Sequence, residues 1–110
     1  MKKEQMEPVK EKVIEYFNNY GSQYIYGYFG LSRDDVDHII RTGTEIMMNH
    51  WELTNWKPGG FITNFLENNL METYASADMV NQKVIPFYLR MKYNLEYPVF
   101  DETISSNEVQ

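Results

Sequence analysis

Apolar residues recur at helical spacing for about four turns after Ser32, and this pattern constrains the fold more than any other feature of the sequence. The residues of this stripe are Val36, Ile39, Ile40, Gly43, Ile46, Met47, His50 and Trp51. Ser32 is a good helix cap, and the acidic Asp34 and Asp35 suit the positive end of a helix dipole. We therefore predict a long amphipathic helix ending near Leu53, with a neighbouring helix crossing closely at Gly43.

Four further segments have helical patterns. We predict helices over Pro8–Asn19, Phe61–Asn68 and Leu70–Ala75, and a last helix that is capped by Asp78 and ends near Asn94. The fold class is thus all-α, a small bundle of four to five helices. We expect residues 1–98 to form a single domain and residues 99–110 to form an acidic, mobile tail.

The first of these helices has clear start and stop signals. Pro8 suits a first helical position, where its missing N–H is not needed. Its predicted apolar stripe consists of Val9, Val13, Ile14 and Phe17. The run from Asn18 to Ser22, with Gly21 inside it, is predicted to end the helix.

The segment 24–29 is rich in aromatic residues, and the spacing of its apolar residues does not distinguish one type of secondary structure from another. Tyr24, Tyr26 and Tyr28 favour a short extended stretch, but Gly27 interrupts it and no clear second strand is available. We therefore interpret the segment as an irregular, aromatic-rich connection, and a short extended stretch is the alternative. These rings either cap the core or form a contact surface.

Composition and charge restrict the class of protein. The chain has no cysteine, so disulfides and thiolate chemistry are excluded, and no stretch approaches the roughly 20 apolar residues of a membrane span. The net charge of −6, with scattered basic residues, argues against direct nucleic-acid binding. An acidic surface can instead attract a basic partner or imitate a phosphate backbone. The N-terminus lacks a secretory signal, so we expect a cytoplasmic protein.

Catalytic and metal-binding patterns are not visible in the sequence. His38 and His50 are twelve residues apart on one predicted helix, about 18 Å, and cannot share a metal. His38 could pair with Asp34 or Asp35, and His50 is expected to be a partly buried histidine of the apolar face. We expect no metal, no cofactor and no enzymatic activity.

The turn between the long helix and the next one is the most distinctive local element. It consists of Trp56, Lys57, Pro58, Gly59, Gly60 and Phe61, with Trp51 shortly before it. Free N–H groups at a helix start, one lysine and nearby aromatic rings could hold a nucleotide or another small anion. The alternative is a tight interhelical corner whose rings belong to the core.

An ordered set of residues beginning at this turn resembles a pattern in small, uncharacterised helical proteins of bacteriophages and prophages. The set is Pro58-Gly59-Gly60-Phe61, Leu66, Asn68-Asn69-Leu70, Ala77-Asp78, Asn81, Tyr88 and Tyr93. It covers roughly residues 56–97. The sequence departs from the pattern at Asn69, where Asp is common, and in lacking a Trp-Gly-Ser ending. The resemblance implies a phage accessory protein that works in the cytoplasm of a bacterial host.

Two functional hypotheses follow. The first is a non-enzymatic phage protein that binds and interferes with a host or host-defence protein; the alternative is the capture of a small ligand such as a nucleotide signal. The candidate binding residues are those of the turn with Trp51, the tyrosines at 24, 26 and 28, and Asp78 and Asn81. Exposed aromatic residues and the glycine on a helix face also suggest a homodimer.

Overall fold

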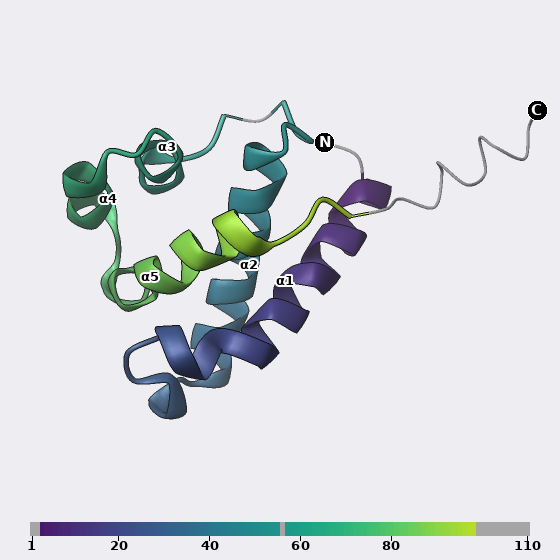
Figure 1. Ribbon diagram of the computed structural model, residues 1–110. Coiled ribbons are helices and arrows are strands. Elements are labelled where there is room, and N and C mark those ends of the chain that lie inside the picture. Colours follow the sequence, from purple (N-terminus) through teal and green to yellow (C-terminus); the bar gives the residue numbers. More distant parts are fainter. Residues whose placement is uncertain (1–2, 56, 99–110) are drawn as a thin grey trace, which may run out of the picture.

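The computed structural model describes residues 3–55 and 57–98, and over these residues the chain is all-α (Figure 1). The elements in order are α1 (Lys3–Tyr24), the short 3-10 helix η1 (Tyr28–Gly30), α2 (Arg33–His50), α3 (Gly60–Leu66), α4 (Leu70–Ser76) and α5 (Met79–Asn94). Five α-helices without a strand in this part of the chain confirm the predicted fold class. The predicted tail, 99–110, lies outside the described residues.

Helices α1, α2 and α5 form the body of the molecule, and the core lies between them. Phe87, Tyr88 and Met91 of α5 are fully buried there, together with Ile39 and Met47 of α2. Gly43 lies where the three helices meet, because a Cβ atom built on it would be 3.1 Å from Val13 and 3.3 Å from Met91. The predicted close crossing at Gly43 is therefore confirmed. This glycine is buried inside the body, so it does not support a dimer contact.

Helices α3 and α4 pack mainly on each other and form a limb, residues 60–76, on the side of the molecule away from α1 (Figure 1). Ile62 and Phe65 of α3 reach the core. Within α4 the one buried residue is Thr73, whose hydroxyl donates to the Asn69 carbonyl oxygen at 2.6 Å. The limb is thus joined to the core through α3, and α4 is its outer element.

Helix α1 is longer at both ends than predicted. Pro8 lies inside the helix rather than at its first position, and the helix continues past Gly21 to Tyr24. Gly21 is buried, and a Cβ atom built on it would be 2.8 Å from the ring of Tyr28. This glycine therefore permits a close tertiary contact and does not stop the helix. The predicted apolar stripe is also partly wrong, since Ile14 is exposed and Tyr16 is buried in its place.

The predicted caps of α2 and α5 are confirmed. The Ser32 hydroxyl accepts from the Asp35 N–H at 3.0 Å, and the Asp35 carboxylate accepts from the Ser32 N–H at 3.1 Å. Asp78 caps α5 by accepting from the Asn81 N–H at 2.7 Å. The end of α2 lies three residues before the predicted one, because Glu52 adopts a left-handed conformation, φ 58°, that reverses the chain.

The aromatic segment 24–29 is an irregular connection, as predicted, and it does not form the extended stretch considered as the alternative. Tyr24 ends α1, Gly27 has a left-handed φ of 76°, and η1 follows directly. The left-handed turn at Gly27 brings Tyr28 back against Phe17, with ring centres 5.5 Å apart. The segment is therefore a compact turn between α1 and α2.

Candidate functional site

The predicted corner at residues 51–61 connects α2 to α3 in an open conformation. Gly59 caps α3 with φ −69°, and neither Gly59 nor Gly60 has a neighbour that a Cβ atom would meet. Neither glycine is thus required by a left-handed backbone or by a close approach. The Pro58 carbonyl oxygen accepts from the Thr63 hydroxyl at 3.3 Å, and Lys57 is exposed. Trp56 lies outside the described residues.

The described rings of this corner have different neighbours. Trp51 packs edge-on against Tyr97, with ring centres 5.4 Å apart. Phe61 packs against Phe65 at 6.3 Å and Tyr88 at 6.1 Å, and so belongs to the edge of the core. Trp51 therefore packs with the segment after α5, whereas Phe61 packs with Phe65 of α3 and Tyr88 of α5.

The three tyrosines of segment 24–29 differ in environment. Tyr24 is half-buried beneath Arg90, whose guanidinium carbon lies 4.8 Å from the ring centre. Tyr28 is half-buried against Phe17. Tyr26 is 81% exposed, and the neighbouring Phe29 is also exposed. Tyr26 is therefore the member of this set that is free to contact a partner directly.

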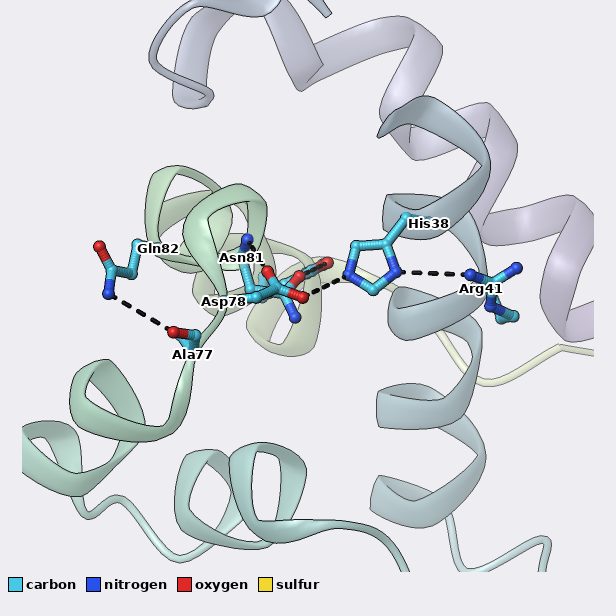
Figure 2. Close-up of polar contacts among 7 residues, drawn as sticks. His38, Arg41, Ala77, Asp78, Asn81 and Gln82 are labelled. Carbon is cyan, nitrogen blue, oxygen red and sulfur yellow. Dashed lines mark hydrogen bonds and ion pairs between the residues drawn. The ribbon is translucent and has the colours of Figure 1, made fainter. Parts of the chain in front are cut away.

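Asp78 and Asn81, two further predicted binding residues, belong to a polar cluster that joins α2 to the start of α5 (Figure 2). The Asp78 carboxylate lies 2.9 Å from His38 Nε2, and Arg41 lies 3.4 Å from His38 Nδ1. His38 thus pairs with Asp78 rather than with Asp34 or Asp35, the partners considered from the sequence. Asp35 is instead occupied by the cap at Ser32.

The inner part of this cluster is buried. The Tyr88 hydroxyl donates to the Asn81 side-chain oxygen at 2.9 Å, and both residues lie in the interior. Burial raises the pKa of Tyr88 strongly, a hydrogen bond with Thr42 partly opposes this rise, and the negative charge of Asp78 adds to it. Tyr88 is therefore a neutral hydrogen-bonding group that stabilises the junction of α2 and α5.

Both ring nitrogens of His38 are engaged in this arrangement. Because an arginine side chain can only donate, its contact makes Nδ1 an acceptor and leaves Nε2 to donate to Asp78. A general acid or base needs a ring nitrogen directed at a substrate. His38 instead links α2 to the start of α5 through its contact with Asp78.

His50 lies at the end of α2 and is exposed, so the prediction of a partly buried ring is wrong. Partial shielding from water, and next the positive charge of Lys92, lower the pKa of His50 from its usual 6.5. Among the described residues no three histidine, aspartate or glutamate side chains are grouped to hold a metal ion. No helix in the described ranges is long and apolar enough to cross a membrane.

Besides Tyr26 and Phe29, four exposed apolar side chains lie close together in the sequence, on the limb and at the start of α5. Leu70 is 55% exposed, Met71 82% and Met79 77%, and Tyr74 is also exposed. We call these four residues the α4 surface. Sequence reasoning missed them, although Leu70, Met71 and Tyr74 share one side of a helical turn. The charged residues from 60 to 82 are Glu67, Glu72 and Asp78, all acidic.

Covering exposed apolar side chains with a partner removes them from water and is favourable, so such residues are candidates for a contact site. No protein-family model, curated protein or solved structure matches the chain.

Proposed function

We propose that this chain is a non-enzymatic phage accessory protein that binds a host or host-defence protein in the bacterial cytoplasm and interferes with it. The observation that carries the proposal is the α4 surface. A methionine with 82% of its side chain exposed, next to an exposed leucine, is typical of a contact site that a partner covers. The phage context comes from the resemblance of residues 56–97 alone.

The placement of the α4 surface supports binding to a protein. Three of its four residues lie on α4, the outer helix of the limb, and Met79 begins α5 (Figure 1). Helical residues at positions i, i+1 and i+4, here Leu70, Met71 and Tyr74, form a compact ridge that fits an apolar groove of another protein. The acidic residues around it favour a partner with basic residues at the groove edge.

Nucleotide capture at the corner is less well supported. Trp51 packs against Tyr97, whereas Phe61 packs against Phe65 and Tyr88. The polar cluster at His38 likewise has its nitrogens occupied. These contacts favour the protein-binding hypothesis over the small-ligand alternative.

A capture experiment with matched variants tests the proposal. The full chain is immobilised and exposed to lysate of the bacterial host, and the recovered proteins are identified by mass spectrometry. The double variant Met71→Glu, Met79→Glu places two charges on the α4 surface, and Tyr93→Glu is a control on an exposed aromatic of α5. We expect one specific protein to be recovered by the wild type and the control and to be lost with the double variant.

The purified partner then provides the quantitative test. We expect its Kd for the double variant to rise at least tenfold, which corresponds to about 1.4 kcal/mol. Expression of the wild type, but not of the double variant, should restore the plating of a phage that the host defence blocks. Recovery of no specific protein, or equal affinity of wild type and double variant, contradicts the proposal.

A further inference from the structure

A groove of about 720 Å³ lies between α1 and α2, and much of its lining is apolar. Its apolar residues are Met6, Ile14 and Phe17 of α1 and Val36 and Ile40 of α2. Phe17 and Ile40 are buried at its base, whereas Ile14 is 36% exposed at its edge. We call this feature the α1–α2 groove. It leaves an apolar strip of the body in contact with water, on helices that the limb does not cover.

The charged residues that line the groove balance one another. Lys10 and Arg41 are basic, and Asp37 and Glu45 are acidic, so these four side chains sum to zero. The whole chain has a net charge of −6. Two copies of an acidic protein repel each other at most orientations, and a neutral face is the one at which they approach with the least repulsion.

The charge pattern of the groove is also complementary to itself. In a two-fold dimer the same patch meets its own copy, so each cation can face an acid of the second copy and the reverse. Asp37, Arg41 and Glu45 follow one another at four-residue intervals along α2 and therefore alternate in sign along one face. The charged residues of the limb, Glu67 and Glu72, are both acidic, so two limbs that face each other would repel.

We infer that the α1–α2 groove is a self-association surface, at which two copies pack symmetrically and Ile14 of each copy enters the groove of the other. This inference concerns α1 and α2 and does not rest on the proposed function, which concerns α4. The groove is large enough to accept apolar side chains from a neighbouring helix, and packing two such faces together would remove the exposed part of Ile14 from water.

A charge-swap experiment on the full chain tests this inference. One variant carries Lys10→Glu and Arg41→Glu, and the other carries Asp37→Lys and Glu45→Lys. Sedimentation velocity is expected to show a dimer for the wild type and a monomer for each variant alone. An equimolar mixture of the two variants is expected to restore a dimer, because opposite charges then meet across the interface.

Controls separate loss of the interface from loss of the fold. Circular dichroism checks the helix content of each variant, and recovery of the dimer on mixing shows that both are folded. Ile14→Glu is expected to weaken self-association at least tenfold, whereas Tyr26→Glu, on an exposed residue outside the groove, should leave it unchanged. If the wild type stays monomeric at protein concentrations up to about 1 mM, the inference is wrong, and the groove would then bind an unrelated molecule. Dimers that survive in Ile14→Glu or in the separate charge variants also overturn it.

Discussion

The body and the limb are built from helices of the same kind but differ in what those helices bury. In the body, α2 and α5 bury residues along most of their length, including Ile39, Met47 and Phe87. In the limb, α4 buries Thr73 and exposes Leu70 and Met71. An apolar residue in the body therefore contributes to folding, whereas an apolar residue on α4 is available for binding.

The two regions also differ in the charges that surround their exposed apolar residues. The α1–α2 groove has two basic and two acidic side chains, whereas the charged residues of the limb, Glu67 and Glu72, are both acidic. The first pattern suits a second copy of the chain, and the second suits a basic partner. We therefore propose that exposed apolar area identifies the two candidate contact sites and that the nearby charges select the kind of partner.

The largest expected effect comes from paired truncations in the two regions. Phe87→Ala removes a fully buried ring from the body and should lower the free energy of unfolding by about 3–5 kcal/mol. Leu70→Ala on the exposed face of α4 should change it by less than about 0.5 kcal/mol. Urea denaturation followed by circular dichroism measures both. Similar losses for the two variants would show that α4 is part of the folding core.

A smaller effect is expected at the buried polar junction of α2 and α5. Tyr88→Phe removes one hydroxyl and leaves the Asn81 side-chain oxygen buried without its donor. The free energy of unfolding should fall by about 1–3 kcal/mol. The matched change Tyr93→Phe, on an exposed ring, should have almost no effect. Equal stability of the two variants would mean that Asn81 finds another donor.

The smallest effect on stability is expected at the polar contact between α2 and the start of α5, directly after the limb. His38→Ala removes the contact with Asp78, and because both side chains are partly exposed the global cost should be below about 1 kcal/mol. Asp78 precedes α5 directly and follows α4, so amide hydrogen exchange should speed up in α4 more than in α1. His50→Ala serves as a control at the other end of α2. Unchanged exchange in α4 would show that α3 alone positions the limb.

Much of the helical framework could be predicted because it depends on local interactions. Ser32 and Asp78 were identified as caps since a helix start needs a side-chain acceptor within a few residues. Several residues that carry the phage resemblance also have local roles, at turns and helix starts. Asn68 adopts a left-handed φ of 63° after α3, Asn69 caps α4 and Asp78 caps α5, so this ordered set consists largely of turns and helix starts that frame the limb.

The predictions that were wrong concern residues whose role is set by distant neighbours. Local rules predict that Pro8 and Gly21 mark the ends of a helix, yet α1 includes both residues. Gly21 is buried against Tyr28. His38 could be paired with Asp34 or Asp35 on its own helix, but its partner Asp78 is forty residues away. Ile14 was assigned to the core, and the packing of α2 leaves it at the edge of a groove.

Periodicity, caps and charge are properties of short segments. The all-α class, the positions of most helices and the acidic character of the chain could therefore be predicted from the sequence. Which apolar residues remain exposed depends on the tertiary packing. That outcome depends on which helix covers which face, and the pairing of α3 with α4 leaves Leu70 and Met71 in water while α2 and α5 enclose Phe87. The candidate contact surfaces are therefore a consequence of packing between segments that are distant in the sequence.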